Sequence, residues 1–128
     1  MADKIEDVRV EVSVQTQYIE QQSDPNETRF AFAYTITIQN NSDRWCQLLN
    51  RHWVITDAAG KVEEVQGEGV VGEQPKLNPG EGFRYTSGTI LQTPVGAMQG
   101  TYEFQEADGT LFDVPIPVFS LSQPNLVH

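Results

Sequence analysis

Apolar and polar residues alternate along most of the chain with a period of two. In residues 8–14, valine occupies every second position and charged or polar residues lie between. Residues 30–38 repeat the pattern, with Phe, Tyr and Ile alternating with Ala and Thr. This alternation is typical of strands with one buried face, and aromatic and β-branched residues fit such a pleated surface. Both segments are therefore predicted to be strands.

Further strands follow along the rest of the chain. They are predicted at residues 47–56, 61–65, 83–87, 101–104 and 111–114. The last two form a hairpin, because Asp108-Gly109 between them is a strong turn signal. One face of the segment 47–56 is expected to carry Leu49, Arg51, Trp53 and Ile55, with Trp53 in the core. No stretch keeps helical spacing over three turns, so about seven strands without helices predict an all-β sandwich.

Length and charge narrow the classes of function. The 128 residues fit one domain, 1–128, with a tail at residues 122–128 that is expected to be flexible. The net charge of −10 disfavours binding to nucleic acid or to an anionic membrane, whereas it suits solubility or a basic partner. A lone cysteine, Cys46, favours a reducing compartment, and no signal peptide or membrane span is evident. We therefore expect a cytoplasmic protein.

Glycine is concentrated in one segment of the chain. Residues 67–100 hold eight of the ten glycines. Gly67, Gly69 and Gly72 match the G-x-G-x-x-G pattern, which in dinucleotide-binding proteins places the amides at a helix N-terminus against a pyrophosphate. Two prolines in residues 73–79 make a following helix improbable, and Lys76 and Arg84 are the first cations after the motif in sequence. A tight turn, a protein-binding loop and a weaker anion site made of loop amides all remain open.

Catalytic and metal sites find little support in the sequence. A Cys46–His52 dyad is the one nucleophilic arrangement available, and a strand histidine is more often a packed or surface residue. Zinc needs several Cys or His ligands, and this chain has three such residues in all. Glu63, Glu64 and Glu68 fit a solvated acidic strand better than a cation site. We expect no catalytic residues, no metal site and no cofactor.

Several longer motifs resemble the ApaG (CorD) family. They are residues 50–57, 67–75, 77–81, 83–88 and 93–102, which together span much of the chain. The resemblance implies a fibronectin type III-like, that is immunoglobulin-like, sandwich in a small bacterial cytoplasmic protein. It also implies links to cobalt resistance, magnesium efflux and diadenosine-tetraphosphate metabolism, and protein binding in related eukaryotic domains. No catalytic residues are established for the family.

Two hypotheses for function follow. The first is a non-catalytic protein–protein interaction module, with a surface that includes Trp45, Arg84 and Tyr85. The second is nucleotide or pyrophosphate binding by the loop made of Gly67, Gly69, Gly72, Glu73 and Gln74. Direct binding of divalent cations is a third idea, which the shortage of His and Cys disfavours. A sandwich with free edges can also form a homodimer, although nothing in the sequence requires one.

Overall fold

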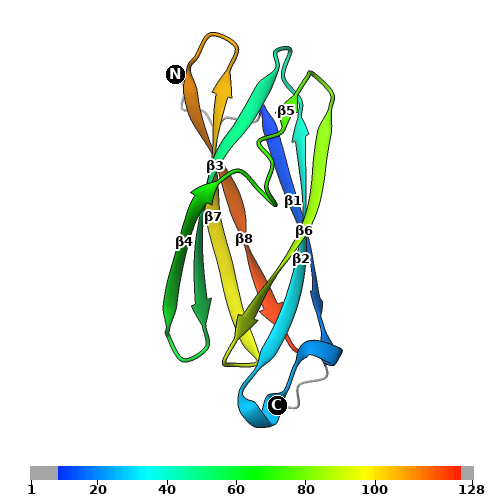
Figure 1. The fold of residues 1–128 in the computed structure, drawn as a ribbon, viewed down its shortest axis with the longest axis vertical. Coiled ribbons are helices and arrows are strands. Elements are labelled where there is room, and N and C mark those ends of the chain that lie inside the picture. Colours follow the sequence, from blue (N-terminus) through cyan, green and yellow to red (C-terminus); the bar gives the residue numbers. More distant parts are fainter. Residues whose placement is uncertain (1–8, 125–128) are drawn as a thin grey trace.

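Two antiparallel sheets face each other and enclose the core (Figure 1). The computed structural model describes residues 9–124. The strands are β1 (Val10–Tyr18), β2 (Phe30–Asn40), β3 (Cys46–Asp57), β4 (Val62–Glu68), β5 (Lys76–Leu77), β6 (Gly82–Leu91), β7 (Val95–Glu106) and β8 (Leu111–Ser122). Two single-turn 3-10 helices, η1 (Glu20–Gln22) and η2 (Pro25–Glu27), connect β1 to β2. The predicted all-β sandwich is confirmed. Val8 and residues 125–128, which belong to the predicted first strand and tail, lie outside the described residues.

The smaller sheet has the order β1-β2-β6. Its central strand β2 shows the predicted alternation, because Phe30, Phe32, Tyr34, Ile36 and Ile38 are all buried. The threonines between them face outward, where Thr35 and Thr86 share a hydroxyl hydrogen bond of 2.8 Å across β2 and β6. One face of this sheet therefore supplies half of the core.

The larger sheet has the order β4-β3-β7-β8, and β5 pairs with the start of β3. β4 and β5 lie along the same edge of β3, because β4 pairs with residues 50–56 and β5 with Cys46 and Gln47. Together they form one edge strand that is interrupted by residues 69–75. The glycine motif lies at this interruption.

A β-bulge in β3 changes the predicted distribution of side chains. The register of β3 against β7 shifts between Leu48 and Asn50. Leu48 is consequently buried with Trp53 and Ile55, whereas Leu49 is only half-buried. The prediction that Leu49 shares the core face was therefore wrong, because a bulge adds one residue and reverses the alternation beyond it.

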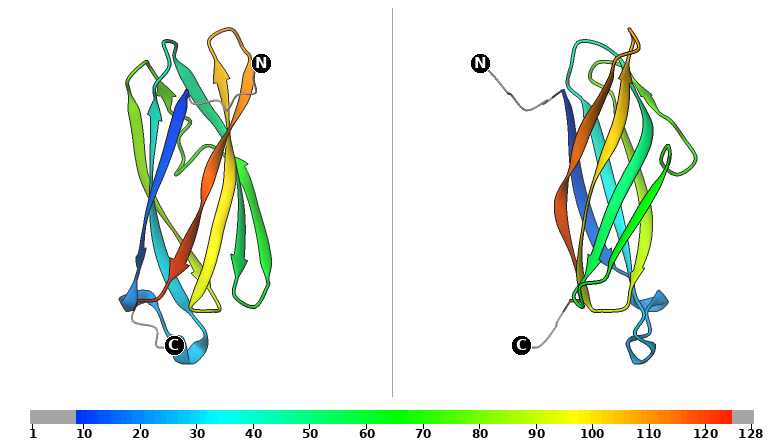
Figure 2. Two further views of the ribbon diagram at one scale, coloured as in Figure 1. Left: turned by 180° about the vertical axis from the view of Figure 1, so that it is seen from behind. Right: turned by 90° about the vertical axis from the view of Figure 1, so that its left-hand side faces the viewer.

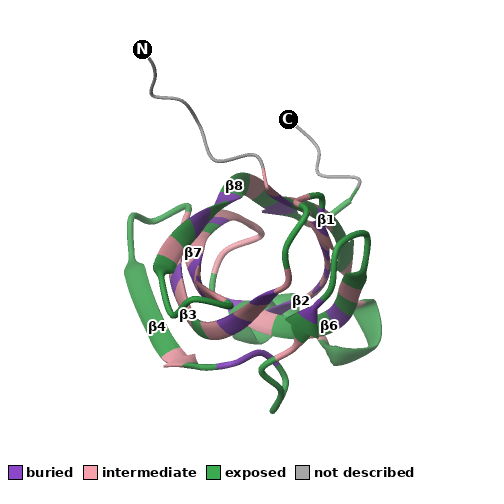
Figure 3. Cartoon of the chain, turned by 90° about the horizontal axis from the view of Figure 1, so that it is seen from above, coloured by how far each residue is buried: buried purple, intermediate pink, exposed green. Residues whose placement is uncertain are grey.

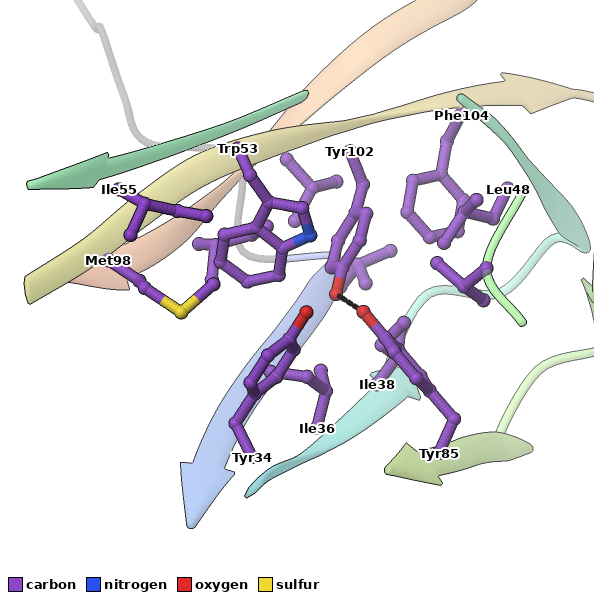
Figure 4. Packing of buried hydrophobic residues seen from close by; sticks show 14 of the residues in the cluster. Tyr34, Ile36, Ile38, Leu48, Trp53, Ile55, Tyr85, Met98, Tyr102 and Phe104 are labelled. Atoms are coloured by element: carbon purple, nitrogen blue, oxygen red, sulfur yellow. Dashed lines mark hydrogen bonds between the residues drawn. The ribbon is translucent and has the colours of Figure 1, made fainter. Parts of the chain in front are cut away.

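The core is built around Trp53. Its indole packs edge-to-face against Tyr34, Tyr102 and Phe119, with ring centroids 5.4, 6.3 and 5.9 Å apart. Trp53 is 3% exposed, so its predicted place in the core is confirmed (Figure 4). The flanking strands β7 and β8 are longer than predicted, since β7 begins at Val95 and β8 continues past Pro115 and Pro117.

The sandwich has one closed and one open side. Seen from behind, β1 and β8 run beside each other and close one side (Figure 2). On the opposite side, β4 and β6 are edge strands like β1 and β8, but they are not in comparable contact with each other. Seen from above, part of the loop after β4 is buried between these two edges (Figure 3). No helix among residues 9–124 is long and apolar enough to cross a membrane.

Candidate functional site

The glycine motif forms an excursion of the edge strand whose two ends stay paired with β3. The Gly69 amide donates to the Leu49 carbonyl at 2.8 Å, and the Leu48 amide donates to the Pro75 carbonyl at 3.0 Å. Between these anchors, the Val70 and Glu73 amides each donate to the other residue's carbonyl at 2.8 and 2.9 Å. The motif therefore joins a strand to a tight turn and a second strand, and no helix follows it in the described part of the chain.

Two of the three glycines of the motif have a structural reason. A Cβ on Gly67 would lie 2.8 Å from the Arg51 guanidinium nitrogens, and one on Gly69 would lie 2.4 Å from the Glu73 carbonyl oxygen. Gly69 and Gly72 also have φ of +66° and +82°, in the left-handed region that favours glycine. Backbone geometry thus accounts for Gly69 and Gly72 without a bound phosphate, whereas Gly67 faces only the far end of the Arg51 side chain.

The turn places one apolar side chain inside the protein and one outside. Val70 is 1% exposed and belongs to the core, whereas Val71 is 54% exposed at the tip. Val71 has φ of 42°, which is strained for a β-branched residue. The loop therefore inserts Val70 into the core and exposes Val71 at its tip.

Arg51 is the cation that the structure brings to this loop. Its Nη1 donates to the Glu68 carbonyl at 3.1 Å and to the Gly69 carbonyl at 2.9 Å. Arg51 lies opposite Gly67 on one neighbouring strand and Tyr102 on the other. Sequence reasoning named only Lys76 and Arg84 as nearby cations, because the pairing of β3 with β4 cannot be read from local sequence.

A hollow between the sheets lies on the open side of the sandwich, and we call it the inter-sheet cleft. It has two parts, of about 540 and 310 Å³, which share Tyr34, Arg51, Trp53 and Ser87. The larger part extends between β4 and β6, and the smaller one reaches the turn at Val71 and Gly72. Arg51 is the only cation that lines either part within residues 9–124.

Exposed apolar residues surround the mouth of this cleft. Val65 of β4, Ile90 of β6 and Val71 of the loop are 37%, 47% and 54% exposed, and each lines the cleft. Apolar side chains that gather around a hollow are typical of binding surfaces. The open side therefore offers an aromatic floor, one cation and an apolar rim.

Two tyrosines form a buried pair behind the cleft. The hydroxyl groups of Tyr85 and Tyr102 are 2.5 Å apart (Figure 4). Burial raises the pKa of Tyr85 to about 12, although the hydrogen bond with Tyr102 lowers it in part. Burial raises the pKa of Tyr102 further, as do the proximity of Tyr85 and the hydrogen bond to it.

The three residues predicted for a partner surface lie in different environments. Trp45 precedes β3 and is half-buried, with the Lys76 ammonium 4.1 Å from its ring centroid. Arg84 is exposed on β6, in the other sheet. Tyr85 is 7% exposed and points into the core, where it lines the smaller part of the inter-sheet cleft. The alternation along β6 places adjacent residues on opposite faces.

Glu73 and Gln74 differ in their structural roles. Both are exposed. The side-chain amide of Gln74 donates to the backbone carbonyl of Leu49 at 3.0 Å. The side-chain amide of Gln47 donates to the backbone carbonyl of Gln74 at 2.9 Å. Gln74 thus fixes the loop to β3, whereas the Glu73 side chain is directed to solvent.

The structure does not bring together the residues that the sequence analysis considered for catalysis or metal binding. Cys46 is buried at 3% exposure, and His52 lies six residues further along the same strand, a separation of roughly 20 Å. The His52 Nε2 atom is 2.8 Å from the Glu64 carboxylate on the outer face. In the described ranges, no group of three or more His, Cys, Asp and Glu residues could hold a metal ion.

An acidic row crosses the outer face of the larger sheet. Glu68, Asn50, Glu103 and Asp113 are successive cross-strand neighbours on β4, β3, β7 and β8. They line a shallow hollow of about 590 Å³, in which the Asn50 amide donates to Glu103 at 2.7 Å. The chain's negative charge is therefore prominent on this face, and the hollow shares Arg51 and Glu68 with the smaller part of the inter-sheet cleft.

Comparisons with known proteins agree with this fold. A family model described as the ApaG domain matches residues 20–106. A Protein ApaG from Acidithiobacillus ferrooxidans is 56% identical over 119 residues, which span 93% of this chain and 94% of the relative. A Protein ApaG from an Enterobacter species is 54% identical, with 97% and 99% covered. A crystal structure of a Bordetella pertussis protein described as ApaA has a TM-score of 0.89 at 48% identity, and the match covers 91% of this chain and 95% of that one.

Proposed function

This chain belongs to the ApaG domain family, and from that premise we propose that it is a non-catalytic module that binds an extended segment of a protein partner in the inter-sheet cleft. The observation that supports this most strongly is the apolar rim of Val65, Val71 and Ile90 around an aromatic floor. Such a rim can bury a partner's side chains.

The free edge of β6 supports an extended partner. A strand that is paired on one side only can accept another strand through backbone hydrogen bonds. β4 carries Glu63, Glu64 and Glu68, and such charges hinder strand addition, whereas β6 has one charged residue, Arg84, and no proline. We therefore expect the partner segment to run along β6.

Capture of partners by rim variants tests this function. Val71→Asp and Ile90→Asp should each lose most of a protein that wild type retains from lysate, because a carboxylate replaces an apolar contact. Val118→Asp is the matched control, since Val118 is 65% exposed on β8, outside the cleft. Thermal unfolding of each variant shows that the fold is kept. Equal retention by all three variants would contradict the proposed surface.

Nucleotide or pyrophosphate binding by the loop is the second candidate. The position of the Arg51 guanidinium beside Gly67 and Gly69 favours it. The missing helix, the paired amides of Val70 and Glu73, and the nearby carboxylate of Glu68 disfavour it. Backbone NMR shifts during titration with ATP, GTP, diadenosine tetraphosphate and pyrophosphate, with and without magnesium, decide between the two. Saturable shifts at residues 67–74 would favour the phosphate site.

We further propose that the link to cobalt and magnesium, which only the family resemblance implies, acts through a protein partner in the cytoplasm. The chain has only two histidines and one cysteine, which are the ligands that cobalt prefers alongside carboxylates. Calorimetric titration with cobalt should accordingly show only weak binding without a defined stoichiometry. Tight binding of about one ion per chain would reverse this assignment.

A further inference from the structure

Arg51 is a half-buried cation without a carboxylate partner. Arg9 and Arg51 are the two half-buried cations among residues 9–124, and the others there are exposed. Arg9 forms an ion pair with Glu106, whereas no ion pair of Arg51 is present in the described part of the chain. Charges taken out of water normally have a partner of opposite sign. The positive charge in the cleft is therefore available to an anion.

The Arg51 guanidinium is also held in a fixed orientation. Nη1 donates to the Glu68 and Gly69 carbonyls, and the group packs against the Gly67 α-carbon. Its Nε and Nη2 donors have no protein acceptor among residues 9–124. A guanidinium fixed at one nitrogen loses little further entropy when its other donors bind a ligand.

Tyr34 supplies a second polar group to the same cleft. Tyr34 is 6% exposed, lines both parts of the cleft, and its hydroxyl has no hydrogen-bond partner within the described residues. Figure 4 shows that hydroxyl pointing toward the Tyr85–Tyr102 pair, which is already bonded within itself. Ser87 lies directly opposite Tyr34 on β6 and also lines the cleft. Buried polar groups are nearly always paired, so an unpaired hydroxyl in a cleft that also holds the unused Nε and Nη2 donors of Arg51 points to a ligand.

We propose that Arg51 and Tyr34, with Ser87, form a receptor for the side-chain carboxylate of an acidic residue in the bound segment. This inference rests on the proposed function, because it names the residue type that the cleft selects. A guanidinium matches the planar carboxylate, and the surrounding aromatic residues strengthen the contact. One cation beside the cleft-lining Glu63 and Glu68 suits a singly charged carboxylate better than a phosphate dianion.

Peptides selected from an unbiased phage-displayed library on the wild-type chain test this receptor. NMR shifts should place them in the cleft, and one Asp or Glu should recur at a fixed position. Changing that residue to its amide should weaken binding to wild type about tenfold, the size of one charge-assisted hydrogen bond. For the Arg51→Met variant, the affinities of the acidic peptide and its amide should differ by less than about twofold, since the charge that pairs with the carboxylate is gone.

Tyr34→Phe is the second variant, because Arg51→Met also releases the loop carbonyls. Removing an unpaired hydroxyl should leave the melting temperature unchanged or raise it. The variant should nevertheless bind the acidic peptide several-fold more weakly and the amide peptide equally well. This difference between two peptides separates a ligand contact from a purely structural effect.

The outcomes are distinct. If peptides bind the cleft without an acidic preference, the carboxylate receptor is overturned and the docking function stands. If no selected peptide shifts cleft residues, both are overturned. If pyrophosphate displaces the acidic peptide at concentrations far below those needed for acetate, the receptor binds phosphate and the carboxylate assignment is wrong.

Discussion

The phenols of Tyr85 and Tyr102 tie the two sheets together at the centre of the core. Tyr85 comes from β6 of the smaller sheet and Tyr102 from β7 of the larger one. Their hydrogen bond satisfies two buried polar groups, and burial keeps both protonated well above the usual pKa of a phenol. The folded protein therefore holds two protons that the unfolded chain releases near pH 10.

We expect stability to fall as the pH rises above 10. The pKa of Tyr85 is raised to about 12 in the folded state, so its contribution is complete below pH 10 and is lost between pH 10 and 12. Each such group lowers the free energy of unfolding by up to about 1.4 kcal/mol per pH unit in that range. Urea unfolding between pH 9 and 11.5 should show this slope, and Tyr85→Phe should reduce it. If the slope of Tyr85→Phe equals that of wild type, Tyr85 ionises at the same pH in the folded protein as in the unfolded chain.

The strained valine at the loop tip gives a second prediction for a single residue. Val71 has φ of 42° and is 54% exposed, so it gains little from burial. Val71→Asn should raise the free energy of unfolding by about 1 kcal/mol, because Asn tolerates the left-handed region. It should also weaken partner capture, since the rim loses an apolar contact. Destabilisation in urea titrations would show that the valine side chain supports the fold.

At the scale of the element, the glycine turn is expected to depend on Gly69 more than on Gly72. Both have positive φ, but only a Cβ on Gly69 would meet the Glu73 carbonyl, at 2.4 Å. Gly69→Ala should therefore cost about 3 kcal/mol and Gly72→Ala about 1 kcal/mol in chemical unfolding. Loss of ligand binding by Gly69→Ala with unchanged stability would instead support a phosphate loop.

The strands with regular alternation could be predicted from sequence, and the irregular ones could not. β2 follows a period of two from Phe32 onward because it is the central strand of its sheet, with one face in the core. The bulge at Leu48–Asn50 reverses that period within β3, and no local residue signals it. The approach of Arg51 to the loop was likewise hidden, because it results from pairing between distant segments. The candidate site thus depends mainly on the register in which distant strands pair, which local sequence does not reveal.

At the scale of the whole molecule, one side of the sandwich is closed and the other open. β1 packs beside β8 on the closed side, whereas β4 and β6 are free edges on the open side. Amides at these free edges should exchange with solvent much faster than those of β2, β3 and β7. Hydrogen exchange followed by NMR should show this difference, and a cleft-binding peptide should slow exchange along β6. Protection confined to β1 and β8 would place the partner on the closed side.

The order of strands also determines when the domain can form during synthesis. β2 pairs with β6, and β3 pairs with β7, yet both of these partners begin only at Gly82 or later. Until they leave the ribosome, the apolar faces of β2 and β3, with Trp53 and Ile36, have only the first half of the chain to pack against. Contacts so distant in sequence cannot form hairpin by hairpin. We therefore expect the nascent chain to fold late, after β8 with Phe119 has emerged, and a ribosome stalled before that point to present an unfinished and aggregation-prone core.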